Sequence, residues 1–398
     1  MQPLRRLLPL ALTPSQSRDV FVVLHPADPM HQTRLTSIDA LRGLASLAVV
    51  FWHWQHFFPT DPAPTEQFPL FWLFGPLYQH GWWGVELFFS ISGFIFFRLY
   101  AEPVARGDVG GLSFAILRFS RLYPLYFAAM VFVAVTQIAT RALTGSDFVF
   151  PSDSPAQFVQ QLLLTTAWSG HSYTFNGPAW SVVVEMMLYA IFFGLAKLRL
   201  ARLPVVAAIC ALAPFLLNAD APLVRGVLSF FLGGLCAEII RHAQSRSGLP
   251  HAARIYLPVS ILCMIVARMI WPHGTLAEFI AFNFVFPGLI IVLVIYDDVL
   301  QPVTSRLEWL GNISYSSYLL HFPLQLALVT MAAWQGWQID YRSPVTLLTF
   351  LIVLITLSLW SFRWFERPAM NALRRRLMAR ASSVPQSAAA LPVQVRSV

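Results

Sequence analysis

The sequence contains little charge and little cysteine. Asp, Glu, Lys and Arg make up 12% of its 398 residues, whereas an ordinary globular domain carries about 25%. Hydrophobic residues make up 57%, so there are too few charged side chains to cover a surface that faces water on all sides. The composition therefore excludes an ordinary soluble protein and favours one whose main solvent is the lipid bilayer.

The scarcity of cysteine excludes two further classes of protein. Cys210, Cys236 and Cys263 each lie inside an apolar segment, without the paired spacing of a metal site or a disulfide framework. We therefore expect no metal and interpret all three as packing residues. The formal charge of +8 does not indicate nucleic acid, because the arginines alternate with apolar runs rather than gathering on a soluble face.

Apolar runs long enough to cross a hydrocarbon core of about 30 Å recur along most of the chain. We count about ten and predict an all-α integral membrane protein with its transmembrane helices in a single bundle. No internal repeat is evident, which argues against a transporter built from inverted repeats. The predicted runs are Ile38 to Phe58, Trp82 to Tyr100, Phe119 to Thr140, Trp180 to Leu198, Pro204 to Leu217, Val224 to Ile240, Tyr256 to Trp271, Phe279 to Tyr296, Ile313 to Trp334 and Val345 to Trp364.

Basic residues fall in alternate connecting segments, which predicts the orientation of the chain because Lys and Arg resist translocation. Arg141 and Arg342 are the main exceptions. Both termini are then cytoplasmic, and we predict a multi-pass protein of the inner (cytoplasmic) membrane. The residues that carry this bias are Arg98, Arg106, Lys197, Arg199, Arg202, Arg241, Arg246, Arg254, Arg306 and the tail arginines Arg374, Arg375, Arg376 and Arg380.

The two ends of the chain differ in composition from the middle. Residues 1–34 resemble a weak signal peptide but lack a small-residue cleavage site, and we predict a disordered N-terminal extension. Residues 35–372 form the predicted membrane domain. Residues 373–398 begin with arginines and continue in Ser, Ala and Pro, which predicts a basic, disordered cytoplasmic tail.

An arginine and a histidine share one face of the first run. Arg42 and His53 are offset by only about 20° on an α-helix and stand roughly 16 Å apart along its axis. An ionised side chain at the bilayer centre costs about 3 kcal/mol, so Arg42 needs a partner, and Asp39 lies one turn before it. Because imidazole titrates near neutral pH, His53 is a candidate general base. The competing interpretation places Arg42 on cytoplasmic phosphates and His53 at the membrane interface.

Two other runs carry polar residues at helical spacing. In the second run, Glu86 and Ser90 share a face, and the small residues at Ser92 and Gly93 indicate either room for an acyl chain or a tight helix crossing. The fourth run places three polar residues four positions apart, at a depth comparable with His53. The carboxylate of Glu185 is a candidate for supporting His53 or for binding a sugar substrate, and a structural ion pair is the alternative. These residues are Ser181, Glu185 and Tyr189, preceded by Trp180.

Basic and polar residues also mark three more helix segments. Arg118 and Arg121 lie one turn apart at the predicted cytoplasmic face, where two guanidinium groups suit phosphate or simply hold lipid headgroups. His321 lies in a polar stripe of the ninth run and is interpreted as a bundle residue rather than a second base. Glu366, between Arg363 and Arg367, is interpreted as part of a salt-bridged stop at the end of the tenth run.

Together these motifs resemble the acyltransferase-3 family, the bacterial integral-membrane O-acyltransferases that modify polysaccharides, lipopolysaccharide, Nod factors and some antibiotics. The order of the motifs across ten runs is more specific than any one of them. Glu86 stands where many members have Asp, and Val182 where Leu is common. The resembling stretches are Asp39 to His53, Gly81 to Phe94, Arg118 to Tyr126, Trp180 to Tyr189, Gly311 to Pro323 and Arg363 to Pro368.

The resemblance implies an acyl-coenzyme A donor, expected to be acetyl-CoA, as a co-substrate rather than a tightly bound cofactor. It implies that Arg42 and His53 are essential catalytic residues. From its depth in the membrane, we expect Glu185 to support the histidine. Arg118, Arg121 and Arg42 are then expected to bind the donor phosphates. The residues expected to bind substrate are Trp180, Ser181, Glu86, Ser92, Tyr189 and His321.

The expected acceptor is a hydroxyl of a saccharide or glycolipid, as in O-antigen, exopolysaccharide or Nod-factor modification, and membrane lipids are the other expected partners. Two alternatives stay open. A proton-coupled transporter or flippase of a saccharide or lipid would use His53 and Glu185 as a proton relay. An inactive scaffold in a polysaccharide-synthesis complex is disfavoured because every candidate reactive group is retained.

Overall fold

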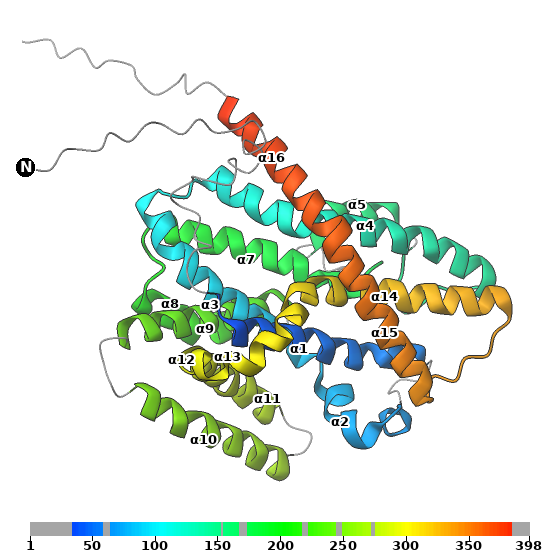
Figure 1. Ribbon diagram of the computed structural model, residues 1–398, viewed down its shortest axis with the longest axis horizontal. Helices are drawn as coiled ribbons and strands as arrows, with labels where there is room; N and C mark the ends of the chain where they lie inside the picture. Colours follow the sequence, from blue (N-terminus) through cyan, green and yellow to red (C-terminus); the bar gives the residue numbers. More distant parts are fainter. Residues whose placement is uncertain are drawn as a thin grey trace, which may run out of the picture. The chain divides into compact units, whose positions relative to one another are not determined.

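The computed structural model describes residues 34–58, 64–152, 154–166, 173–216, 222–243, 249–271 and 275–383, and every regular element in these ranges is a helix (Figure 1). The principal helices are α1 (Thr36–Trp52), α2 (Phe71–His80), α3 (Trp83–Arg106), α4 (Gly111–Thr144), α5 (Pro155–Leu162), α7 (Trp180–Lys197), α8 (Leu203–Leu216), α9 (Pro222–Ala243), α10 (Leu249–Ile270), α11 (Leu276–Ile280), α12 (Phe286–Ile295), α13 (Asp297–Thr304), α14 (Glu308–Gln335), α15 (Pro344–Trp360) and α16 (Arg367–Ser383).

Short helical turns join several of these helices. The 3-10 turns are η4 (His53–Phe57), η5 (Thr65–Gln67), η6 (Gly177–Ala179) and η8 (Ser305–Leu307). Two π-helical turns, η7 (Ala281–Val285) and η9 (Ser361–Glu366), lie inside longer helical stretches. A π-turn adds one residue to a helical turn and is frequent at functional sites. It therefore changes which face of the helix the following residues occupy.

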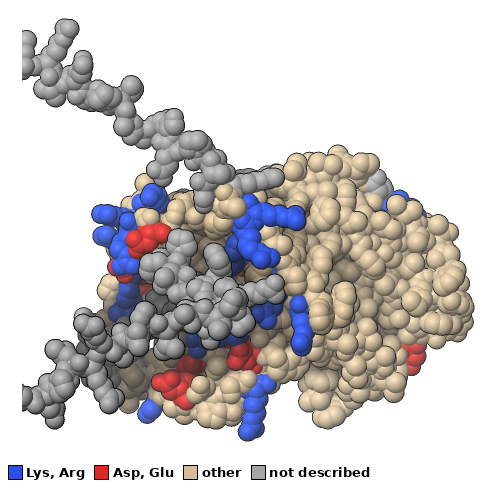
Figure 2. Space-filling model, turned by 45° about the horizontal axis from the view of Figure 1, so that its top comes forward, with Lys and Arg blue, Asp and Glu red and all other residues tan. Residues whose placement is uncertain are grey.

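Among the described residues, seven helical stretches are long and apolar enough to cross a membrane, which confirms a multi-pass membrane protein. They are Trp83–Arg106, Gly111–Thr144, Gly177–Lys197, Leu223–Ala243, Pro250–Ile270, Leu276–Ile295 and Pro344–Ala379. The three other predicted runs fall on α1, α8 and α14, so the count of ten stays a prediction, as does the cytoplasmic placement of both termini. On the face shown in Figure 2, charged side chains gather over one half, beside a broad area with very few.

Small residues allow α1 to pack closely against α14 and α3. A Cβ atom on Gly43 would lie 2.4 Å from the Leu310 side chain, and one on Gly311 would lie 2.4 Å from the Asp39 carbonyl oxygen. On the α3 side, a Cβ atom on Gly84 would meet the Ala45 carbonyl oxygen at 2.5 Å. Close backbone approach of this kind is the usual basis of helix association in membranes. It fixes α1 between α3 and α14.

The crossing of α3 and α9 is tighter still. A Cβ atom on Gly93 would lie 1.8 Å from the Phe230 carbonyl oxygen, and one on Gly233 would lie 1.8 Å from the Ser90 carbonyl oxygen. Neither position has room for any side chain. Of the two interpretations of the small residues in the second run, Gly93 therefore serves the helix crossing rather than an acyl channel.

The C-terminal part of the chain is helical further than its composition predicts. The boundary predicted at residue 373 falls inside α16, which continues to Ser383. Residues 373–380 are mainly Leu, Met, Ala and Arg, all strong helix formers, so the helix that starts in the membrane continues through them. Residues 384–398, and the extension predicted for residues 1–33, lie outside the described residues.

Candidate active site

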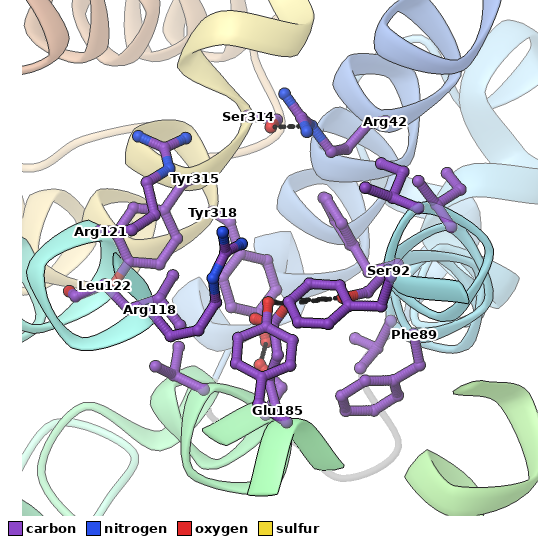
Figure 3. A pocket seen from close by; sticks show the side chains of 18 residues that line it. Arg42, Phe89, Ser92, Arg118, Arg121, Leu122, Glu185, Ser314, Tyr315 and Tyr318 are labelled. Carbon is purple, nitrogen blue, oxygen red and sulfur yellow. Dashed lines mark hydrogen bonds between the residues drawn. The ribbon is translucent and has the colours of Figure 1, made fainter. Parts of the chain in front are cut away.

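A cavity of about 180 Å³ lies between α1, α3, α4, α7 and α14 (Figure 3). Seven residues singled out in the sequence line it, contributed by four helices that are far apart along the chain. They are Arg42, Ser92, Arg118, Arg121, Ser181, Glu185 and Tyr189. The rest of the lining is mostly apolar and aromatic, with Ser314, Tyr315 and Tyr318 from α14 as the other polar members.

Arg42 is fixed at the cavity by three groups. Its Nη2 lies 3.3 Å from the Asp39 carboxylate, as the sequence predicts, and donates to the Gly311 carbonyl oxygen at 2.6 Å. Its Nε donates to Ser314 Oγ at 3.0 Å. The tight crossing at Gly43 and Gly311 makes these bonds possible because it brings the α14 backbone within reach of the guanidinium.

Arg118 and Arg121 lie one turn apart on α4 and have different surroundings. The Arg118 guanidinium lies 5.0 Å from the Phe96 ring centroid and 4.7 Å from that of Tyr100, and it donates to the Tyr100 hydroxyl at 2.5 Å. Arg121 lies near the Tyr315 ring, with Nη1 3.8 Å from a carboxylate oxygen of Glu366. Figure 3 shows Arg42 and Arg121 away from Glu185, with the Arg118 side chain between Arg121 and Glu185 in this view.

Glu185 occupies the opposite part of the cavity among hydroxyl groups. Its Oε1 accepts a hydrogen bond from Ser92 Oγ at 3.1 Å and another from the Tyr189 hydroxyl. Nearby, the hydroxyls of Ser181 and Tyr318 are 2.7 Å apart. The cavity thus combines three guanidinium groups with a carboxylate and several hydroxyls, an arrangement suited to a ligand that has both an anionic group and a reactive polar group.

His53 lies beside the cavity but not in its lining. Its side chain is buried, and its ring centroid is 4.6 Å from that of His321 and 4.9 Å from that of His56. Its Nδ1 is 2.8 Å from the Val49 carbonyl oxygen. Within the described ranges, no hydrogen bond or ring contact joins His53 to Glu185. The connection to the cavity runs through His321, whose ring centroid is 6.0 Å from that of Tyr318.

The remaining two candidates, Glu86 and Trp180, form a separate cluster with an arginine that sequence reasoning missed. Arg225 of α9 donates through Nε to Glu86 Oε1 at 2.7 Å, and its guanidinium lies 5.0 Å from the Trp82 ring and 5.8 Å from the Trp180 ring. The signal available in the sequence was a single arginine inside an apolar run, at the second position of the run that begins at Val224.

Glu366 is the second residue whose position the sequence did not reveal. Its side chain is buried against Arg121, whereas the sequence suggested a surface ion pair with Arg363 or Arg367. The physical reason is the π-turn η9, which carries the residue around to the inner face of the helix. In the part of the chain that the structure describes, no group of three His, Cys, Asp or Glu side chains could hold a metal ion.

Two comparisons with known proteins gave a match. A family model described as an acyltransferase domain, of the acyltransferase-3 type, matches residues 35–364. The chain is also similar to "Protein 2 in picA locus" of Rhizobium radiobacter, with 30% identity over 172 residues that cover 40% of this chain and 81% of that protein. No solved structure matches.

Proposed function

Because the chain belongs to the acyltransferase-3 family and is a multi-pass membrane acyltransferase, we propose that it transfers an acyl group, expected to be acetyl, from acyl-CoA to a hydroxyl of a saccharide or glycolipid at the bacterial inner membrane. The observation that carries this proposal is the cavity in which Arg42, Arg118 and Arg121 face Glu185. The guanidinium groups of these arginines suit the phosphates of coenzyme A. The hydroxyls and the carboxylate of the cavity suit the thioester and the acceptor hydroxyl that react.

The donor is expected to bind through its phosphates. Arginine forms charge-assisted bidentate bonds with phosphate, and Arg118 forms no ion pair with a carboxylate of a described residue, so its charge is available to a ligand. Arg42 and Arg121 already have carboxylate neighbours, which fix where their guanidinium groups lie. The thioester, at the end of the pantetheine arm, would then reach the apolar part of the cavity beside Ser92 and Glu185.

In the proposed transfer step, the proton taken from the acceptor ends on the coenzyme A thiol. His53 takes the proton of the acceptor hydroxyl, the oxygen attacks the thioester carbonyl, and the carbon–sulfur bond breaks. The imidazolium then returns its proton to the thiolate, which leaves as coenzyme A. Tyr318 and His321 lie between the cavity and His53. The acceptor hydroxyl would therefore have to pass these two side chains to reach His53. Glu185, which lines the cavity, would bind the acceptor or stabilise the charge that develops on His53.

The decisive experiment combines donor turnover with analysis of surface glycans. Purified protein is incubated with labelled acetyl-CoA, and release of free thiol is measured with and without extracted glycan. In parallel, a deletion strain is complemented with wild type or with His53→Ala, and its glycans are analysed by mass spectrometry. We expect an ester only with wild type. Proton-coupled flux of a saccharide or lipid without any thioester cleavage would instead indicate a transporter.

The same protein preparation tests for a covalent intermediate. Of the three serines that the sequence offers as acyl acceptors, Ser90, Ser92 and Ser181, the last two line the cavity and are the candidates to accept the acyl group before transfer. After denaturation, label that stays on a peptide containing either serine would establish an acyl-enzyme. Label that leaves completely with the small molecules would support direct transfer.

A further inference from the structure

The Glu366 carboxylate is buried, although the arginines on either side of it in the sequence are exposed. Only 3% of its surface is exposed. The neighbouring Arg363 and Arg367 are exposed and lie over the Trp364 and Phe362 rings, at 5.5 and 5.7 Å from the ring centroids. The π-turn η9 therefore separates this carboxylate from the two cations beside it in sequence and directs it into the helix bundle.

The two oxygens of this carboxylate have different surroundings. Oε1 accepts hydrogen bonds from Ser316 Oγ of α14 and, at 3.1 Å, from Ser361 Oγ of η9. Oε2 has no hydrogen-bond partner among the described residues, and its closest cation is Nη1 of Arg121, at 3.8 Å. Two hydroxyls from separate elements thus hold one oxygen, so that the other faces a single guanidinium.

Arg121 lies between this carboxylate and the cavity. Its side chain lines the cavity, and its guanidinium lies 5.8 Å from the centroid of the Tyr315 ring. Tyr315 is itself fixed, because its hydroxyl donates to the Leu122 carbonyl oxygen at 2.6 Å. A guanidinium has five N–H donors in a rigid fork. A single carboxylate oxygen at 3.8 Å occupies none of them at hydrogen-bond distance, so the fork remains available to a ligand.

We propose that Glu366 is a positioning residue, which holds the Arg121 guanidinium so that its free N–H groups point at the phosphates of the acyl-CoA donor. This inference rests on the proposed function, because it assumes that the cavity binds such a donor. A buried carboxylate in a membrane protein is costly unless it is paired or serves a task. Here the two serines supply the hydrogen bonds to Oε1, and Arg121 supplies the opposite charge at 3.8 Å, so the carboxylate can hold Arg121 in one orientation.

The test measures binding of coenzyme A and of pantetheine, which lacks the nucleotide and its phosphates, to purified full-length protein by titration calorimetry. The variants are Glu366→Gln, which keeps an oxygen for the two serines but removes the charge, and Glu366→Asp, which keeps the charge. Arg367→Gln is the matched control, because it removes an exposed neighbouring charge. Thermal unfolding of each variant shows whether it is folded.

We expect Glu366→Gln to weaken binding of coenzyme A about tenfold, the scale of a lost contact to a charged group, and to leave pantetheine binding unchanged. Glu366→Asp should restore part of the loss, and Arg367→Gln should bind like wild type. In an Arg121→Gln background, Glu366→Gln should cause no further loss, because the two residues act through one contact.

The inference is overturned if Glu366→Gln binds coenzyme A as tightly as wild type, or more tightly because a competing negative charge has gone. An equal loss with and without Arg121 would overturn it as well, since Glu366 would then act on the fold rather than on the guanidinium. A wild-type protein that does not distinguish coenzyme A from pantetheine would contradict the proposed donor site itself. The two failures are therefore distinguishable.

Discussion

Glu86 and Arg225 are 139 residues apart in sequence, and in the structure Arg225 Nε donates to the Glu86 carboxylate at 2.7 Å. The pair links the beginnings of α3 and α9, just before their tight crossing at Gly93 and Gly233. The Glu86 side chain is 2% exposed and that of Arg225 28%. The carboxylate therefore depends on this arginine for its charge partner.

Removal of Arg225 is expected to destabilise the protein. Arg225→Gln leaves the Glu86 carboxylate buried without its cation, and breaking such a pair costs about 3 kcal/mol. Thermal unfolding in detergent should show a lower midpoint than wild type. The double variant Glu86→Gln, Arg225→Gln should recover much of the loss, because no charge is left buried. A double variant as unstable as Arg225→Gln would show that the charge pair is not what holds the two helices.

The α3–α9 crossing should not tolerate even one added methyl group at Gly93. Gly93→Ala places a Cβ atom against the Phe230 carbonyl oxygen, and overpacking of this kind costs about 1–3 kcal/mol. We expect a lower unfolding midpoint and less protein in the membrane fraction. Gly194→Ala in α7 is the control, because a Cβ atom there meets nothing within 4 Å. If the two variants had the same unfolding midpoint and the same amount of protein in the membrane fraction, α3 and α9 would not cross as closely as described.

The rings of His53, His56 and His321 lie together, so the effects of substituting neighbouring histidines on activity can be compared. His53→Ala should lower acyl transfer at least about 100-fold, the usual contribution of a general base, with normal membrane insertion. His56→Ala, which loses the contact of Nδ1 with the Gln325 side chain at 3.1 Å and the ring contacts of His56 with its neighbours, should keep most of the activity. Comparable losses in both variants would mean that the cluster acts through packing.

Arg118 should contribute to donor binding, whereas Arg141, which lies outside the cavity on the same helix, should not. Arg118→Gln should raise the dissociation constant for coenzyme A about tenfold, because a charge-assisted bond to phosphate is lost. Arg141→Gln, at the far end of α4, removes a guanidinium that already pairs with Asp147 and should bind the donor like wild type. Unchanged affinity in Arg118→Gln would remove this residue from the donor site.

Glu185 should affect the chemical step more than donor binding. Glu185→Gln keeps an oxygen that Ser92 and Tyr189 can donate to but removes the negative charge in the cavity. We expect kcat to fall while the KM for the acyl donor changes little, as for an interaction made in the transition state. Tyr189→Phe, which removes one hydroxyl and no charge, should have a smaller effect. A rise in donor KM with unchanged kcat would place Glu185 in the binding of coenzyme A instead.

Several contacts could be predicted from the sequence because they are local. Asp39 and Arg42 are three residues apart, so the periodicity of one helix is enough to place them together. The shared faces of Ser181, Glu185 and Tyr189 follow in the same way, and these side chains line one cavity. A family resemblance carried by such motifs then added the arginines of α4, which lie on the same cavity.

Other relationships depend on which helices cross. The partner of Glu86 comes from α9, and Gly311 and Ser314, which accept hydrogen bonds from Arg42, both come from α14. The hydropathy pattern does not specify these neighbours, because apolar helices in lipid gain little from one apolar partner over another. The positions without room for a side chain, Gly93 and Gly311, select the crossings.

The sequence by itself determined that this chain spans the membrane in many helices and carries the motifs of an acyltransferase, because both properties depend on local composition and spacing. Only the tertiary structure decided that Arg42, Arg118, Arg121 and Glu185 share one cavity while His53 lies beside it with two other histidines. Likewise, only the π-turn at residues 361–366 turned Glu366 inward to Arg121. Long-range packing and a single inserted residue in a helix are not recorded in any local pattern, and this is the physical reason for the difference.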